Sequence, residues 1–307
     1  MSLYLVTGGA GFIGSHLTDA LLAQGHQVRV LDDFSTGQRA NLRPNAELVV
    51  GDVADPDVVA GAMAGVAACF HLAAIASVQR GNEDWLGTHR VNLGGTIAVL
   101  DAARQHGRVP VVYASSAAVY GDTGDAVAVE TLPCAPQTAY GADKLGAEQH
   151  AAVGWNVHGV PSVGLRFFNV YGPRQDPFSP YSGVISIFAS RIVAGEGITL
   201  HGDGGQTRDF VYVADVVAHL LAALALLERE PGARVFNVCT GRETSIALLA
   251  GVLGQLCDAP PRITLGPPRA GDIRRSMGDP ERAKAVLGVE AATGLESGLR
   301  SLLTAAP

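Results

Sequence analysis

The chain has 307 residues, of which 48% are hydrophobic and 17% are charged, so it is long and apolar enough to bury a substantial core. This composition excludes an intrinsically disordered protein. The net charge of −7 argues against a nucleic-acid-binding protein, while a local basic pocket for one phosphorylated ligand stays open.

The first 25 residues predict the start of a dinucleotide-binding unit. LYLVTGGAGFIGSHLTDALLAQG (3–25) has the pattern of an apolar strand, a glycine turn and an amphipathic helix. In the GxxGxxG motif, Gly8 would make the turn, Gly11 would admit a pyrophosphate, and Gly14 would let helix and strand pack closely. No basic segment of a signal peptide precedes the strand, which predicts a cytoplasmic protein.

The next two strands each end in an acid. QVRVLDDFSTG (27–37) places Asp32 where a carboxylate can bind both hydroxyls of an adenosine ribose. A carboxylate would repel a 2′-phosphate, so the residue favours NAD over NADP. The alternative, that Asp32 and Asp33 merely open a turn, stays open. VVGDVAD (49–55) ends a third strand and places Asp52 at the adenine edge.

The alternation then continues along the chain. Strands are predicted within 66–74, 109–121 and 161–172, and helices over 84–106 and 139–158. This order predicts an α/β fold with a doubly wound parallel (Rossmann) sheet. We expect a dinucleotide-binding domain over 1–168 and a smaller α/β substrate-binding domain over 169–307. The boundary is interleaved, because 207–240 again has a strand–helix–strand pattern and could rejoin the sheet.

Residues 139–149, AYGADKLGAEQ, place Tyr140 and Lys144 one helical turn apart. Ser115 and Ser116 run off the carboxyl end of the preceding strand, where ligands of open parallel sheets bind. A phenol has a pKa of about 10, and a nearby ammonium and a positive nicotinamide ring would both lower it. Tyr140 could then take a proton from a substrate hydroxyl held by Ser116 while hydride passes to NAD, and Lys144 would also bind the nicotinamide ribose.

The segments TGGAGFIG, HLAA, YASSAAVYG and YGADK resemble the extended branch of the short-chain dehydrogenase/reductase superfamily over almost the whole chain. The resemblance implies that Tyr140, Lys144 and Ser116 are catalytic and that Asn92, in RVNLGGT, lies near the active site. It implies NAD as cofactor, with a binding set of Gly8, Gly11, Phe12, Ile13, Gly14, Asp32, Asp33, Ser35, Thr36, Gly37, Asp52, Val53, Leu72, Ala73, Ala74, Asn92, Ser115, Tyr140, Lys144 and Phe167.

Three later segments carry the substrate prediction: residues 166–188, 200–216 and 267–276. Arg208 and Arg269 could converge on a pyrophosphate through bidentate guanidinium contacts, and Asp272 could hold a ribose hydroxyl. Surface arginines in ion pairs are the alternative. The segments resemble the UDP-hexose 4-epimerases, which implies a UDP-sugar site made of Ser77, Val78, Ser116, Tyr140, Asn169, Val184, Arg208, Arg269, Asp272 and Ser276.

The resemblance implies interconversion of UDP-glucose and UDP-galactose through a 4-keto sugar that turns about its pyrophosphate, with no net redox change. By the same resemblance, Ser276 stands where a large aromatic residue would exclude an N-acetyl group, so UDP-N-acetylglucosamine and UDP-N-acetylgalactosamine should also be accepted. An ordinary serine at a strand edge is the alternative. Two departures from the family pattern, Gly81 in place of a common serine and His201 in place of an aromatic or aliphatic residue, leave the finer sugar and uracil contacts open.

Three other functions compete. A 4,6-dehydratase would need an acid pair where this chain has Ala117 and Ala118, so elimination lacks its acid and base. A UDP-glucuronate 4-epimerase or another nucleotide-sugar reductase stays open. A non-catalytic NAD-sensing protein belongs to a different class, and such proteins often lack the tyrosine or lysine that this chain has.

The remaining predictions concern metals, membranes and assembly. The four cysteines form no CxxC pair, which predicts no metal site and a reducing compartment. The apolar stretch 216–227 is too short to span a bilayer, so no membrane partner is expected. The resemblance implies a homodimer formed through helices 84–106 and 139–158.

Overall fold

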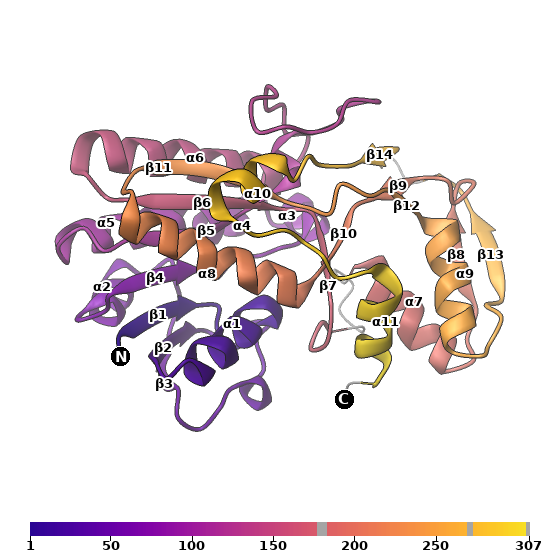
Figure 1. The fold of residues 1–307 in the computed structure, drawn as a ribbon, viewed down its shortest axis with the longest axis horizontal. Coiled ribbons are helices and arrows are strands. Elements are labelled where there is room, and N and C mark those ends of the chain that lie inside the picture. The colour runs from indigo at the N-terminus through magenta and orange to yellow at the C-terminus, as the bar shows by residue number, and fades with distance from the viewer. Residues whose placement is uncertain (177–182, 269–272, 305–307) are drawn as a thin grey trace.

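The structure is a computed structural model that describes residues 1–176, 183–268 and 273–304, apart from three side chains at positions 78, 79 and 82. Its centre is a seven-stranded parallel sheet in the order β11-β6-β5-β4-β1-β2-β3 (Figure 1). The predicted doubly wound parallel sheet is confirmed. Its strands are β1 (Leu3–Thr7), β2 (Gln27–Asp32), β3 (Glu47–Val50), β4 (Ala68–His71), β5 (Val111–Ser116), β6 (Ser162–Phe167) and β11 (Ala233–Val238).

Helices cover both faces of this sheet, which is why its inner strands are apolar on both sides. In β1, Val6 belongs to the core cluster built with α1 (Phe12–Ala23) and α8 (Val213–Arg229). The preceding Leu5 belongs to the opposite cluster, built with α2 (Pro56–Met63), α5 (Gly95–Gln105) and α6 (Ala139–His158). Successive strand residues point to opposite faces, so a continuous apolar run serves both cores.

The smaller elements gather at one end of the large sheet (Figure 1). They form three short sheets: β7 (Asn169–Tyr171) with β10 (Phe210–Tyr212), β9 (Thr207–Arg208) between β12 (Thr244–Ser245) and β14 (Arg275–Ser276), and β8 (Ile198–His201) with β13 (Ile263–Gly266). A third apolar cluster joins β7, β8 and β10 to α7 (Val184–Val193), α9 (Ile246–Leu256) and α11 (Leu295–Thr304). Helix α10 (Glu281–Leu287) packs back on α8 and β11.

Two predicted elements are divided in the structure. The single strand expected within 161–172 is wrong: β6 ends at Phe167 and β7 belongs to another sheet. The backbone changes partners there, because the Phe168 amide donates to Val238 and the Asn169 amide donates to Asp209. The helix expected over 84–106 consists of α4 (Trp85–His89), a π-helical turn (Arg90–Gly94) and α5, preceded by α3 (Val78–Glu83).

The segment 207–238 contributes its last strand, β11, to the large sheet beside β6. The division at 168/169 into two domains stays a prediction. Within the described residues, no helix combines the length and apolarity needed to cross a bilayer.

Candidate functional site

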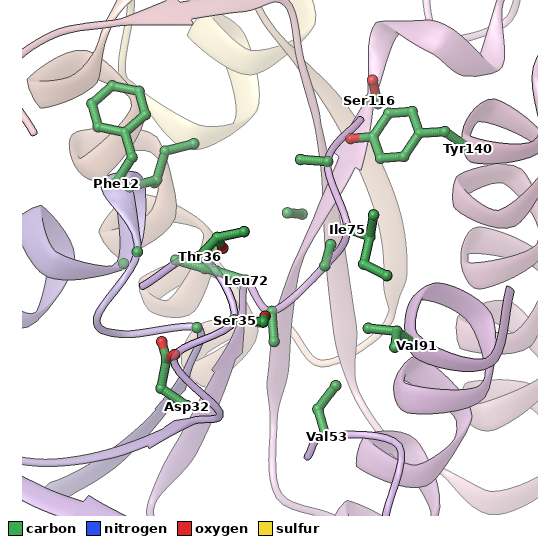
Figure 2. A pocket seen from close by; sticks show the side chains of 18 of the residues that line it. Phe12, Asp32, Ser35, Thr36, Val53, Leu72, Ile75, Val91, Ser116 and Tyr140 are labelled. Atoms are coloured by element: carbon green, nitrogen blue, oxygen red, sulfur yellow. The ribbon is translucent and has the colours of Figure 1, made fainter. Parts of the chain in front are cut away.

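A cavity of about 610 Å³ lies at the carboxyl ends of the central strands. Figure 2 shows Asp32 at one end of it and Tyr140 with Ser116 at the other. The described lining includes these predicted residues: Gly8, Gly11, Phe12, Ile13, Gly14, Asp32, Asp33, Ser35, Thr36, Asp52, Val53, Leu72, Ala73, Ala74, Ser115, Ser116, Tyr140, Lys144, Phe167 and Asn169.

The glycine turn leaves no room for side chains. Gly8 has a φ of +69°, and a Cβ there would lie 2.7 Å from the Ala73 nitrogen. A Cβ on Gly14 would lie 2.1 Å from the Gly8 carbonyl oxygen, so α1 and β1 pack at backbone distance. Helix α1 begins directly after this turn and directs its amino end at the cavity, an arrangement that favours a pyrophosphate.

Asp32 ends β2 and is 7% exposed. One carboxylate oxygen accepts the Ala10 amide and the other accepts the Phe34 amide, both at 2.9 Å. Burial raises the pKa of this carboxyl from its ordinary value, while the two amide hydrogen bonds lower it. A Cβ on Gly37 would lie 2.7 Å from the same carboxylate, so a glycine is needed for the following loop to approach it. These features fit the ribose end of NAD.

The opposite end holds the predicted catalytic residues. Thr138 caps α6 by accepting the Gly141 amide at 3.0 Å, which places Tyr140 in the first turn. The hydroxyl groups of Tyr140 and Ser116 lie on the same wall of the cavity (Figure 2). The Lys144 ammonium lies 5.8 Å from the centre of the Tyr140 ring and donates to the Ala114 carbonyl at 2.7 Å.

The pKa values of these groups are set mainly by burial. Burial lowers the pKa of Lys144 to about 8, against the opposing charge of Asp143. Burial raises the pKa of the Tyr140 phenol, and a hydrogen bond with Ser116 acts in the opposite direction. In the protein without NAD, desolvation outweighs the effects that lower the pKa of the phenol. That the ammonium and the nicotinamide ring together lower it stays a prediction.

Asn92 does not line the cavity; it holds the loop that does. Its side chain is buried, accepts the Ile75 amide at 2.8 Å and donates to the Ile75 carbonyl at 3.2 Å. The residue lies within the π-helical turn, a local widening that often occurs at functional sites. Ile75 and Val91 line the cavity beside each other in Figure 2, and the sequence pattern gave no signal for either.

A directed hydrogen-bond chain backs the same loop. The Ala73 amide donates to the Thr7 hydroxyl at 3.2 Å, and Thr7 lies 2.8 Å from His71 Nδ1. His71 Nε2 lies 3.1 Å from the Thr96 hydroxyl, which donates to the Asn92 carbonyl at 2.7 Å. Because the Thr96 hydroxyl donates its hydrogen to the Asn92 carbonyl, it accepts a hydrogen bond from His71 Nε2. We therefore assign His71 the neutral tautomer that carries its hydrogen on Nε2. Burial lowers the pKa of His71 to about 3, with the Lys144 ammonium contributing.

This buried histidine predicts acid sensitivity. The unfolded chain binds a proton near the ordinary histidine pKa of about 6.5, whereas the folded chain keeps His71 neutral down to about 3. We therefore expect its contribution to the free energy of unfolding to be complete above pH 6.5 and to fall by up to about 1.4 kcal/mol per pH unit below it. Urea unfolding at pH 7.5 and 5.5 should show a flatter pH dependence in His71→Asn than in the wild type. An equally steep fall in this variant would contradict the assignment, and exposed His106→Asn is the control.

Two predicted cofactor contacts are already engaged within the protein. Asp52 accepts the Arg90 guanidinium at 2.6 Å and the Ala54 amide at 2.9 Å. The Ser115 hydroxyl donates to Glu148 at 2.5 Å, so its side chain is committed to α6. Whether either also binds NAD stays a prediction.

The predicted substrate residues are spread more widely over the structure than the predicted cofactor residues. Asn169 is exposed and lines the cavity. Arg208 donates to the Thr207 and Ile273 carbonyls at 2.8 and 2.7 Å and pairs in register with Ser276 across β9 and β14. Ser77 caps α3 by accepting the Arg80 amide.

Six predicted residues do not line the cavity: Gly37, Ser77, Asn92, Val184, Arg208 and Ser276. Arg269, Asp272 and the side chain of Val78 lie outside the described residues. The lining also contains residues that the sequence patterns did not single out: Leu31, Gly51, Ile75, Ala76, Arg80, Asp84, Gly87, Arg90, Val91, Ala114, Phe168, Val170, Gln175 and Gly183. Five of them, Gly51, Ile75, Ala76, Phe168 and Gln175, enter through loops that follow strands, where no fixed spacing marks them.

Comparisons with known proteins show the family to which the chain belongs. Residues 4–239 match the model of the NAD dependent epimerase/dehydratase family. A UDP-glucose 4-epimerase of Mycolicibacterium smegmatis is 39% identical over 303 residues, covering 96% of this chain and 95% of that protein. The structure of a Thermotoga maritima UDP-glucose 4-epimerase with UDP-glucose has a TM-score of 0.93 at 35% identity, covering 98% of this chain and 97% of that one. A UDP-N-acetylglucosamine 4-epimerase of Methanobrevibacter ruminantium, with UDP-N-acetylmuramic acid, has a TM-score of 0.92 at 30% identity and the same two coverages.

Proposed function

Because the chain belongs to the NAD-dependent epimerase/dehydratase family, we propose that it is a UDP-hexose 4-epimerase. It would interconvert UDP-glucose with UDP-galactose, and UDP-N-acetylglucosamine with UDP-N-acetylgalactosamine. The observation that supports this best is one continuous cavity with Asp32 at one end and the Tyr140, Ser116 and Lys144 cluster at the other. A dinucleotide with its ribose on Asp32 would bring its reactive ring to that cluster.

The chain's residues would then divide the work. Asp32, the glycine turn and Lys144 would hold NAD, which would supply the hydride acceptor and donor for the fourth carbon of the sugar. Ser116 would hold the 4-hydroxyl, and Tyr140 would take its proton as the hydride leaves and give it back as the hydride returns. Asn169 and Arg208 would keep UDP anchored while the 4-keto sugar turns, so the hydride returns to the opposite face.

A product assay tests this proposal against its alternatives. Purified protein is mixed with UDP-glucose, UDP-N-acetylglucosamine or UDP-glucuronate without added reductant. A 4-epimer of the first two supports the proposal, and epimerisation confined to UDP-glucuronate favours that substrate instead. A 4-keto-6-deoxy sugar would indicate a dehydratase, which Ala117 and Ala118 argue against. No turnover of any sugar would favour an NAD-sensing protein.

Cofactor choice gives a separate prediction. Asp32 is buried and fixed by two backbone amides, so it has no freedom to move away from a 2′-phosphate. We expect NAD to raise the melting temperature of the cofactor-free protein more than the same concentration of NADP does. Asp32→Ser should reduce the difference between the two melting-temperature shifts, because it weakens NAD binding and removes the repulsion between the carboxylate and the 2′-phosphate of NADP. A larger shift with NADP in the wild type would show that Asp32 has another role.

Substrate width gives another prediction. Ser276 is half-buried in β14, next in register to Arg208 on β9. A small side chain there would leave room for the N-acetyl group of a sugar whose UDP is held by Arg208. Ser276→Tyr should reduce kcat/KM for acetylated sugars far more than for plain ones, because a steric clash discriminates between substrates. Ser276→Ala is the matched control, and equal losses for both sugar pairs in Ser276→Tyr would refute the prediction.

We also propose a homodimer formed through α5 and α6. The two helices expose Ile97, Val153 and Val157, whose relative exposures are 39%, 51% and 68%. These residues lie on the two helices that were predicted to form the dimer. Exposed apolar patches often mark protein interfaces. A cytoplasmic location stays a prediction.

A further inference from the structure

A row of polar side chains lies under α6. Ser115 on β5, Arg166 on β6 and Asn237 on β11 are partners in register on three neighbouring strands. All three are at most 4% exposed. Buried polar residues side by side on three strands of a sheet are unusual, because each must find hydrogen-bond partners away from water.

Glu148 of α6 supplies those partners. Arg166 donates to its two carboxylate oxygens through Nε at 2.8 Å and Nη2 at 2.7 Å, and Ser115 donates to the first of them. Tyr120 completes the cluster: its hydroxyl accepts from Arg166 Nη1 at 2.9 Å and donates to Asn237 at 2.6 Å. The Glu148–Arg166 pair is buried on both sides, with 8% and 5% of the side chains exposed.

The position of Glu148 links the cluster to the candidate active site. Tyr140, Lys144 and Glu148 are spaced by one helical turn each, so they share one face of α6. Lys144 is bonded to the Ala114 carbonyl and Glu148 to the Ser115 hydroxyl. Helix α6 is therefore held at two successive points on β5, just before Ser116.

We propose that the Glu148–Arg166 pair is a positioning element for the reaction: it fixes α6 on β5 so that the Tyr140 phenol faces the Ser116 hydroxyl. The inference rests on the proposed function. Stability alone does not explain the pair, because apolar side chains of similar volume often replace a buried ion pair without loss. A bidentate guanidinium–carboxylate contact supplies what apolar packing lacks, a fixed direction and depth for the helix.

Two variants test this proposal against a purely structural role. Glu148→Gln removes the charge with little change in shape, and Glu148→Met/Arg166→Met replaces the pair by apolar side chains. We expect Glu148→Gln to be less stable than the wild type and the double variant to recover much of the melting temperature. In both, kcat should fall by about 10- to 100-fold while KM for the sugar changes little, as a misplacement near 1 Å can cause. Glu47→Gln, which breaks the distant Arg29–Glu47 pair, is the control and should keep wild-type kcat.

A binding measurement keeps the test independent of sugar turnover. Movement of α6 also moves Lys144, which we propose to hold the nicotinamide ribose. The Kd for NADH should therefore rise by about fivefold in the double variant, the loss expected for one hydrogen bond. The Kd for ADP, which lacks that ribose, should not change.

The outcomes separate the two proposals. A double variant that regains stability, wild-type kcat and wild-type NADH affinity would overturn the positioning role. A wild-type protein that epimerises none of the sugars would overturn the proposed function, and the difference between NADH and ADP would still decide the role of the pair. Unchanged NADH affinity would then count against it.

Discussion

Replacing Tyr140 with phenylalanine should reduce turnover by about 10²- to 10⁴-fold while NAD stays bound. The magnitude is that of losing a general base, because phenylalanine keeps the ring and cannot exchange a proton. The phenol is half-buried on the cavity wall, and desolvation holds its pKa above the ordinary value. We therefore expect its proton to be lost under the influence of bound NAD and substrate. Steady-state epimerisation and the NAD content of the purified variant are the two measurements.

Tyr4→Phe provides the matched control for this prediction. Tyr4 is a buried tyrosine of β1 in the core cluster with α1 and α8, away from Ser116. Its variant should turn over sugar like the wild type. If Tyr140→Phe did so as well, another residue would have to move the proton, and Tyr140 would lose its assignment.

Replacing Gly14 with alanine should abolish tight NAD binding. The added Cβ would lie 2.1 Å from the Gly8 carbonyl oxygen and 2.8 Å from the Gly9 Cα, and neither backbone atom belongs to a side chain that could turn away. Helix α1 would have to move away from β1, which would deform the turn that faces the pyrophosphate. We expect the variant to lose about 3 kcal/mol of unfolding free energy, the upper end for overpacking, and NAD affinity to fall by about 100-fold.

Gly251→Ala is the counterpart of this change. Gly251 is an exposed glycine in the middle of α9, and a Cβ there would meet nothing within 4 Å. Alanine should stabilise the protein by about 0.5–1 kcal/mol, because glycine loses more conformational entropy than alanine when the chain folds into a helix. Thermal unfolding and NAD titration of both variants check the pair. Normal NAD affinity in Gly14→Ala would mean that the glycine turn does not require this close packing.

Features set by short sequence spacing could be predicted. The glycine turn, the acid at the end of β2 and the helix Ala139–His158 each depend on residues a few positions apart. Their geometry follows from a strand, a turn and a helix whatever the rest of the chain does. The parallel sheet followed as well, because strands that alternate with helices rarely pair in another way.

Features set by strand order could not be predicted. Thr7 meets His71 across 64 positions, and Glu148 meets Arg166 only because β5 and β6 are neighbours. Nothing near these residues in the sequence marks them as partners. The depth of burial was equally hidden, and desolvation raises the pKa of Tyr140 in the protein without NAD. The break at Phe168 has no glycine or proline to mark it, since it arises from a change of hydrogen-bond partner.

The route of the backbone through the two sets of sheets bears on how such an enzyme could acquire a new substrate. The chain leaves the large sheet after β6, returns through α8 and β11, leaves again for β12, α9 and β13, returns with α10 and ends with α11 on α9. No single cut in the gene separates one region from the other. Recombination could not exchange the smaller region as a block, and a truncated half would expose both cores. New specificity would instead have to accumulate by point mutations scattered over several distant segments, each compatible with a cofactor site that stays in place.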